Sequence, residues 1–263
     1  MSLEDEVQDV VGKAMRCAGM SAGELARASG LDEAEVRGIL EGDCNQGSLL
    51  VVAPALGLDP QALAELPDYS PETVKVGGVG RLEVPFRDWT VNAWILEHGD
   101  TRLLFDTGWN DQDVLNLVDA ESLDAVFITH PDPDHIGGVE AFQENGVRVI
   151  PETEALETGS YRFGEIEIRV MDLAGHRVPA AGYLISGFER QLWVVGDAIF
   201  AGSMGGCPSP ERFEQAFSTL RKEFSVLEDE VLILPGHGPM TSVGAERVSN
   251  PFHCHFNSAK DLR

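Results

Sequence analysis

Apolar residues in the first quarter of the chain recur every three or four positions. From residue 3 to about residue 66 they form short stripes, a spacing that predicts amphipathic helices. Ser21 followed by Glu24 fits a capping box at the start of one of them. Residues 67–71 contain two prolines and are typical of a linker. The stripes consist of Val7, Val10, Val11 and Ala14; Leu25 and Ala26; Val36, Ile39 and Leu40; and Leu49, Leu50, Val52 and Ala53.

From about residue 73 the pattern changes to short apolar runs separated by turn residues, which predicts strands. Helical spacing returns at 136–144 and at 210–224. Strands interleaved with helices favour a layered α/β fold, so we expect an α/β domain over 71–263 preceded by a small all-α domain over 1–70. The expected strands are 74–76, 81–85, 91–97, 101–106, 125–129, 147–150, 166–170, 183–185, 192–195 and 231–234.

The strongly negative charge of the chain argues against some classes of binding partner. It has 44 acidic against 19 basic residues, a formal net charge of −25. Such a surface argues against nucleic acid and anionic membranes as partners, because both are bound through Lys and Arg. No apolar run reaches the length of a membrane span, and the acidic N-terminus lacks the pattern of a secretion signal. We therefore expect a soluble, cytoplasmic protein that acts on a small molecule.

The most informative segment is the run T-H-P-D-P-D-H-I-G-G at 129–138, between an apolar strand and a helix. It places His130, Asp132, Asp134 and His135 within six residues. The intervening prolines prevent regular structure and keep alternate side chains on one side. Imidazoles and carboxylates together at a loop tip suit a divalent cation.

Three more residues of the same chemical kinds occur farther along the chain. His176 follows a glycine, Asp197 follows the strand expected at 192–195, and His237 follows the strand expected at 231–234. Small residues beside them would leave room for a ligand. The sequence therefore predicts a metal site assembled at the carboxyl ends of several strands.

This ordered set resembles the metallo-β-lactamase superfamily, and within it the glyoxalase II-like hydrolases. The resemblance runs from about residue 73 to residue 252 and implies a four-layered αββα fold. It is also carried by the segments Asn92-Ala93-Trp94, Leu104-Phe105-Asp106-Thr107-Gly108, Gly196-Asp197-Ala198-Ile199-Phe200-Ala201-Gly202-Ser203 and Pro235-Gly236-His237-Gly238-Pro239.

The resemblance also implies the role of each site residue. Two divalent metal ions would hold a bridging hydroxide that hydrolyses an ester, thioester or lactone-like bond. Asp134 and Asp197 would be the catalytic carboxylates, with Asp134 orienting the nucleophile. Asp106 would accept a hydrogen bond from a ligand imidazole. The implied ligands are His130, Asp132 and His176 for one ion; Asp134, His135 and His237 for the other; and Asp197 as the bridge between them.

Asp132 departs from the resemblance, because the superfamily's usual residue at that position is histidine. A carboxylate is a harder ligand than an imidazole, so iron or manganese join zinc as candidate metals. Two other activities consequently stay open: a non-haem iron oxygenase acting on a thiol or persulfide, and a phosphodiesterase. Arg177, which follows His176, would meet either an anionic group of the substrate or a surface carboxylate.

The first segment resembles the helix-turn-helix domain of phage repressors, through Ser21-x-x-Glu24-Leu25-Ala26, Ser29-Gly30-Leu31 and Ile39-Leu40-x-Gly42. The helix that would enter DNA carries Asp32, Glu33 and Glu35 against Arg37, a charge that repels phosphates. We therefore expect the segment to form a homodimer contact or a lid, with a metal- or ligand-sensing regulator as the alternative. His253, Cys254 and His255 are residue types that bind metals. In an extended tail, however, both imidazoles would point away from the thiol, so we expect a surface tail there.

Overall fold

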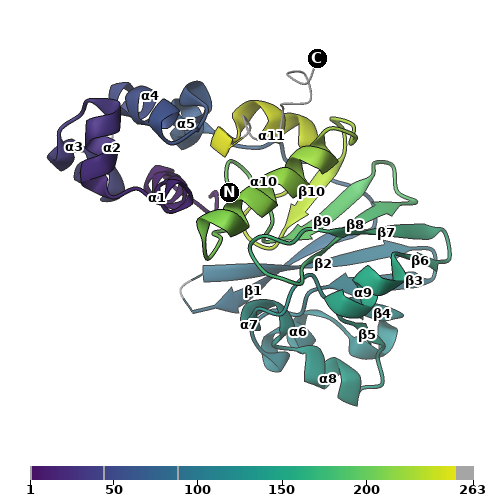
Figure 1. Cartoon of the computed structure of the whole chain (residues 1–263). Coiled ribbons are helices and arrows are strands. Elements are labelled where there is room, and N and C mark those ends of the chain that lie inside the picture. The colour runs from purple at the N-terminus through teal and green to yellow at the C-terminus, as the bar shows by residue number, and fades with distance from the viewer. Residues whose placement is uncertain (1, 44, 88, 253–263) are drawn as a thin grey trace.

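Two β-sheets stacked face to face form the centre of the computed structural model, which describes residues 2–43, 45–87 and 89–252 (Figure 1). The first sheet has the strand order β1-β2-β3-β4-β5, with β3 and β4 parallel. The second has the order β11-β10-β9-β8-β7-β6, with β9 and β10 parallel. The strands of the first sheet are β1 (Val79–Phe86), β2 (Trp89–His98), β3 (Thr101–Phe105), β4 (Ala125–Phe127) and β5 (Val149–Ile150). Those of the second are β6 (Ser160–Phe163), β7 (Ile166–Asp172), β8 (Ala181–Ser186), β9 (Leu192–Gly196), β10 (Leu232–Pro235) and β11 (Thr241–Ser242).

Side chains of the central strands alternate between two apolar clusters, because successive residues of a strand point to opposite faces. In β4, Phe127 packs between the sheets, whereas Val126 packs on the outer face of the first sheet. In β9, Val194 packs between the sheets and Trp193 on the outer face of the second. Both sheets are therefore covered on both faces.

Helices cover the two outer faces. The outer cluster of the first sheet includes residues of α6 and α8, and that of the second includes the apolar stripe of α10. Helix, sheet, sheet and helix give four layers, so the predicted αββα fold is confirmed (Figure 1). The helices of this part are α6 (Asp111–Leu117), α7 (Pro133–Ile136), α8 (Val139–Glu144), α9 (Glu152–Thr158), α10 (Pro210–Phe224) and α11 (Val243–Ser249).

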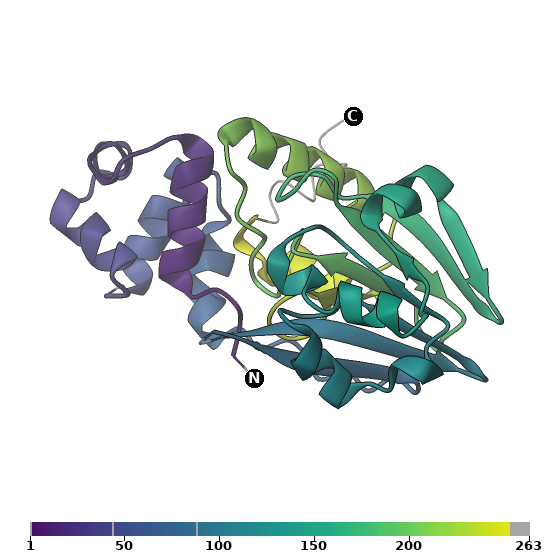
Figure 2. The ribbon, with the colours of Figure 1, turned by 90° about the horizontal axis from the view of Figure 1, so that it is seen from below.

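The helices that precede β1 lie to one side of the sheets in both views (Figures 1 and 2). Their apolar side chains belong to the same buried cluster as α10. Ser21 and Glu24 form the predicted capping box: the Glu24 N–H donates to Ser21 Oγ, and the Ser21 N–H donates to Glu24 Oε2. These helices are α1 (Val7–Ala18), α2 (Ala22–Ser29), α3 (Glu33–Leu40), α4 (Gln46–Ala55) and α5 (Pro60–Glu65), followed by the 3₁₀ turn Leu66–Asp68.

Three sequence expectations for local structure are wrong. Pro133 does not prevent regular structure but begins α7. Residues 74–76 form no strand; instead Val74 and Val76 extend along the molecule and pack against the cluster between the sheets. The helix expected over 136–144 is divided into α7 and α8 by Gly137 and Gly138. A Cβ at Gly137 would lie 1.9 Å from the Trp109 carbonyl oxygen. The break therefore permits a close approach that a continuous helix of larger residues would prevent.

Within the described residues, no helix combines the length and the hydropathy needed to cross a bilayer. His253, Cys254 and His255 lie outside the described residues.

Candidate metal centre

The seven residues predicted as metal ligands converge at one edge of the two sheets. The parallel pairs β3/β4 and β9/β10 end at this edge, and carboxyl ends of parallel strands present the following loops together. His130 follows β4, while Asp134 and His135 begin α7. His176 lies in the connection from β7 to β8. Asp197 comes directly after β9, and His237 comes two residues after β10.

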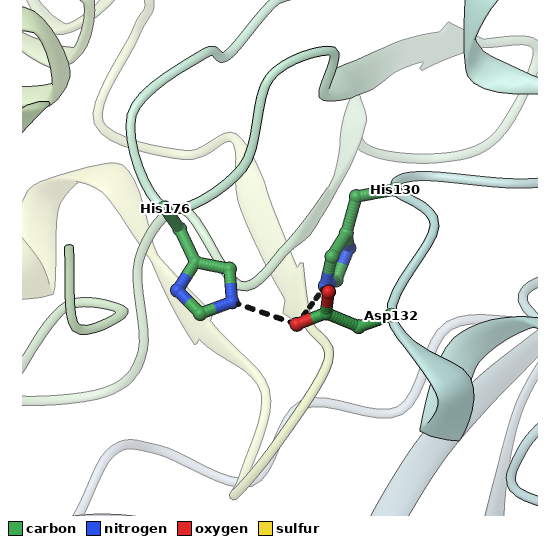
Figure 3. Close-up of side chains that lie close together, drawn as sticks. All are labelled: His130, Asp132 and His176. Atoms are coloured by element: carbon green, nitrogen blue, oxygen red, sulfur yellow. Dashed lines mark hydrogen bonds and ion pairs between the residues drawn. The ribbon is translucent and has the colours of Figure 1, made fainter. Parts of the chain in front are cut away.

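The donor atoms form three overlapping groups in which all atoms lie within 4.8 Å of one another. One group is His130, Asp132 and His176, whose side chains point toward a common centre (Figure 3). The other two groups are His130, His135 and Asp197, and Asp134, His135 and His237.

The Asp197 carboxylate lies between the two outer groups. Its Oδ2 is 3.7 Å from His176 Nε2 on one side and 3.6 Å from His237 Nε2 on the other. Its Oδ1 is 3.4 Å from His135 Nε2. The resemblance implies that Asp197 bridges two metal ions, and this role stays a prediction.

Every imidazole of the cluster has its Nδ1 atom on a protein acceptor. His135 Nδ1 donates to Asp106 Oδ2 at 2.8 Å, the contact that the sequence predicted for Asp106. His130 Nδ1 donates to Thr129 Oγ1 at 2.9 Å, and that hydroxyl in turn donates to Asp106 Oδ2. Backbone carbonyls accept from the other two: the Gly206 oxygen from His176 and the Thr90 oxygen from His237. With each Nδ1 donating to the protein, Nε2 is the ring nitrogen that faces the cluster, and a metal ion can bind there once Nε2 carries no proton.

Three buried polar atoms at the cluster lack a hydrogen-bond partner: His130 Nε2, His135 Nε2 and Asp197 Oδ1. A buried polar atom without a partner carries a free-energy penalty of about 1–3 kcal/mol, so such atoms are uncommon in folded proteins. All three point to the same place, and all are good donors to a divalent metal ion. The residues present therefore fit the metal that the donor set implies.

The acidic and basic groups of the cluster shift one another's pKa. Burial alone would raise the pKa of Asp197 and Asp132, but the surrounding imidazoles, with Arg177 in the case of Asp132, outweigh it and lower both well below the usual range. Burial alone would lower the pKa of His237, but the carboxylates of Asp197 and Asp134 raise it to about 9. The two carboxylates thus stabilise a positive charge at His237, whereas burial and His135 lower the pKa of His130.

Two glycines beside the cluster allow the backbone to approach Asp197 and His135 closely. A Cβ at Gly236 would lie 2.3 Å from Asp197 Oδ1 and 2.6 Å from His135 Cε1. A Cβ at Gly205 would lie 1.8 Å from the Asp197 carbonyl oxygen. A side chain at Gly236 would therefore displace the Asp197 carboxylate, and one at Gly205 would displace the Asp197 backbone.

Sequence reasoning missed several contributors to the site. Thr129 was detectable in principle, since a hydroxyl directly before a ligand histidine is placed to orient it. The carbonyls of Thr90 and Gly206 carry no sequence signal, because any residue offers a carbonyl. Arg177 pairs through its Nε with Asp132 Oδ1, a carboxylate of the cluster that neither of the two expectations for Arg177 had named. Glu4 was also missed; its Oε2 lies 3.9 Å from His237 Nδ1.

Comparison with known families identifies the superfamily. The sequence model of the Metallo-beta-lactamase superfamily matches residues 86–244, which include all seven clustered residues.

Curated proteins and solved structures extend this match. A probable metallo-hydrolase of Streptococcus pyogenes is 26% identical over 199 residues, covering 61% of this chain and 84% of that protein. The hydroxyacylglutathione hydrolase GloC of Haemophilus influenzae is 30% identical over 102 residues, 38% of this chain and 45% of GloC. The crystal structure of the BLEG-1 B3 metallo-beta-lactamase covers 66% of this chain and 99% of its own, with a TM-score of 0.55 and 21% identity. This last similarity concerns the fold alone.

Proposed function

The chain belongs to the Metallo-beta-lactamase superfamily, and from that premise we propose that it is a hydrolase that depends on two divalent metal ions. The observation that carries the proposal is the convergence of four imidazole Nε2 atoms on the Asp197 carboxylate, with His130 Nε2, His135 Nε2 and Asp197 Oδ1 buried and unpartnered. A surface cluster of acidic and basic groups would have its polar atoms paired or solvated.

The proposed division of ligands follows the groups described above. His130, Asp132 and His176 hold the first ion, and Asp134, His135 and His237 hold the second. Asp197 is shared, because it lies within 4 Å of an imidazole of each group. Two bound ions would lower the pKa of a water molecule between them and polarise the oxygen of the bond to be broken.

The protein's own residues supply orientation. Asp106 and Thr129 fix the ring planes of His135 and His130, so the Nε2 atoms are positioned before any ligand arrives. Asp134 Oδ2 lies 3.3 Å from His237 Nε2 and 4.0 Å from His135 Nε2, at the inner side of the second group. We assign to Asp134 the second catalytic role, that of accepting a hydrogen bond from the attacking water and orienting it.

We propose a thioester, ester or lactone of a small molecule as the substrate. The support is the similarity to proteins named as hydroxyacylglutathione hydrolases, whose name specifies a thioester substrate. The carboxylate of Asp132 in the first group keeps iron and manganese beside zinc as candidates for that position.

We also propose that the N-terminal segment forms one wall of the centre. Glu4 lies beside His237, and Lys13 Nζ donates to the Met204 carbonyl oxygen at 2.8 Å, in the loop that follows β9. These contacts support the lid role expected for this segment. The homodimer, the division of the chain at residue 70 and the helix-turn-helix assignment stay predictions.

A reconstitution experiment tests the proposed function. Metal-free protein would be loaded with zinc, manganese or, without oxygen, ferrous iron, and assayed with a hydroxyacylglutathione thioester, a simple ester and a lactone. We expect hydrolysis of at least one of them, lost by at least about 10³-fold in Asp197→Ala and His237→Ala. His98→Ala is the matched control, since His98 is a histidine at the β2–β3 turn, remote from the cluster. Equal hydrolysis by Asp197→Ala and the unaltered protein would overturn the proposal.

A further inference from the structure

The two carboxylate oxygens of Asp132 face different partners. Oδ2 points into the first group of ligands, 3.2 Å from His176 Nε2 and 3.7 Å from His130 Nε2 (Figure 3). Oδ1 forms an ion pair with Arg177 Nε, a residue outside that group. Only one oxygen of Asp132 is thus directed at the position that the first group surrounds.

Arg177 is itself held in place. It directly follows His176, and its Nη1 donates to the His176 carbonyl oxygen at 3.2 Å. The side chain of Asp132 is only 15% exposed, whereas that of Arg177 is 43% exposed. The guanidinium therefore covers Asp132 from the solvent side, and one short segment carries both a predicted ligand and the partner of another predicted ligand.

We propose that Arg177 is a positioning residue for the first metal position, and that it makes Asp132 act as a neutralised ligand through one oxygen. The proposal rests on the metal centre proposed above. It deepens that function by assigning the feature that compensates for a carboxylate where the superfamily usually has histidine.

Two physical effects support this role. The guanidinium holds Oδ1, so the carboxylate cannot turn to present both oxygens to one ion, and Oδ2 stays beside His130 and His176. Its positive charge also cancels the negative charge of Asp132. The group His130, Asp132, His176 and Arg177 then carries the same net charge as three neutral imidazoles.

An ordinary surface salt bridge would behave differently. Exposed ion pairs contribute at most about 1 kcal/mol, and their removal has no consequence for a neighbouring ligand site. The positioning role instead predicts that the effect of Arg177 on metal affinity depends on which residue occupies position 132. With Asp132 present the guanidinium helps by orienting and neutralising the carboxylate. With histidine at that position it has no carboxylate to hold and only repels the cation.

A double-mutant cycle on metal affinity tests this dependence. The four proteins are the unaltered chain, Arg177→Gln, Asp132→His and the double variant. Each would be prepared metal-free and titrated with zinc in competition with a chromophoric chelator, which resolves the two equivalents without any assay of activity. We expect Arg177→Gln to weaken one of the two equivalents by about 10- to 100-fold, the usual effect of removing a residue that orients a ligand. We expect the double variant to bind that equivalent more tightly than Asp132→His alone.

Cobalt provides a second readout of the same position. With Co²⁺ in place of zinc, Arg177→Gln should change the visible absorption of the weaker equivalent, because a carboxylate free to bind through both oxygens raises the coordination number. Arg162→Gln is the matched control, since Arg162 pairs with Glu167 at the exposed edge of the second sheet. It should change neither affinity nor spectrum.

Each outcome is decisive. Equal zinc affinity in the unaltered chain and Arg177→Gln would overturn the positioning role while leaving the proposed function intact. A loss of the same size in both backgrounds would also overturn it, because Arg177 would then act on folding and not through Asp132. Failure of the unaltered chain to bind metal would overturn both proposals.

Discussion

Asp106 lies directly behind His135, with its Oδ2 2.8 Å from His135 Nδ1, and the same carboxylate also accepts the N–H and the hydroxyl of Thr129. Asp106 adopts a positive φ of 61°, a conformation that few residue types other than glycine tolerate. One buried carboxylate thus orients two imidazoles, one directly and one through Thr129. The strained backbone conformation thus occurs at the residue that orients His135 and His130, which are ligands of the two proposed metal positions.

Replacement of Asp106 should therefore weaken both metal positions together. We expect Asp106→Asn to raise the dissociation constant of each equivalent by about 10- to 100-fold, because an amide cannot accept as strongly from His135 and Thr129. Calorimetric titration of metal-free protein measures both dissociation constants. Asp100→Asn, at the exposed β2–β3 turn, is the control. Weaker binding of only one equivalent would contradict the conclusion that Asp106 orients ligands of both positions.

Metal binding should depend on pH through His237. The carboxylates of Asp197 and Asp134 raise the pKa of His237 to about 9 in the metal-free protein, so its proton must leave when a metal binds. The affinity for zinc should therefore rise at least about tenfold per pH unit between pH 7 and pH 9 and less steeply above. The stability of the metal-free protein should change with pH in the opposite direction to its zinc affinity. A raised pKa means that protonated His237 stabilises the fold fully below about pH 6.5, and this stabilisation is lost as the pH rises through about 9. Affinity that stays level from pH 7 to 8.5 would refute the linkage.

The pair of Lys13 and Asp5 should contribute to stability. Their side chains are 12% and 9% exposed and form an ion pair, and Lys13 also donates to the Met204 carbonyl oxygen. Lys13→Met leaves Asp5 buried without a cation, so we expect a loss of about 3–5 kcal/mol in the free energy of unfolding. Denaturant titration checks it, with Arg148→Gln as the control, since Arg148 pairs with Glu154 on the exposed surface. A change below about 1 kcal/mol would show that the N-terminal helices are not anchored through this contact.

Gly236 should tolerate no side chain. In Gly236→Ala the new methyl group would collide with Asp197 Oδ1 and His135 Cε1, so metal affinity should fall by at least about tenfold. Gly77→Ala is the matched control, because a Cβ at Gly77 meets nothing within 4 Å. Zinc titration of the two variants compares them. Equal zinc affinities of the two variants would mean that Asp197 and His135 move aside for the methyl group without loss of metal binding.

Helix α3 should not bind DNA. Glu33 pairs with Arg37 across the helix surface, and Glu35 accepts a hydrogen bond from Ser48 Oγ, so carboxylates dominate the face expected in the groove. We expect no retention of duplex DNA in a gel-shift assay at low salt. If the protein retained the duplex and Arg37→Gln abolished that retention, the alternative of a DNA-binding regulator would be favoured.

The sequence was sufficient for the layers of the fold and for the location of the cluster. Strand ends are marked by apolar runs, and His130, Asp197 and His237 each follow such a run, so their meeting at one edge follows from parallel pairing. Strands of two residues, such as β11, leave no periodic pattern. Val74 and Val76 show the converse: their apolar alternation reflects burial against a core, and no neighbouring strand pairs with them.

The supporting contacts were the part that the sequence could not supply. Arg177 meets Asp132 across 45 residues of sequence, and Thr90 meets His237 across 147. Such partners are fixed by tertiary packing, and in the case of a carbonyl the identity of the residue carries no information. Asp106 was predictable because the resemblance assigned its role, whereas Glu4 lies in a segment that the superfamily match does not reach.

The metal content of the chain tests the central claim most directly. Protein purified without added metal or chelator would be analysed for zinc, iron and manganese per mole of chain. The account predicts about two equivalents in total, with both lost together in Asp197→Ala. Less than about a tenth of an equivalent, with none regained after soaking in each metal, would contradict it, because seven convergent side chains, three of them with a buried unpartnered atom, would then hold nothing.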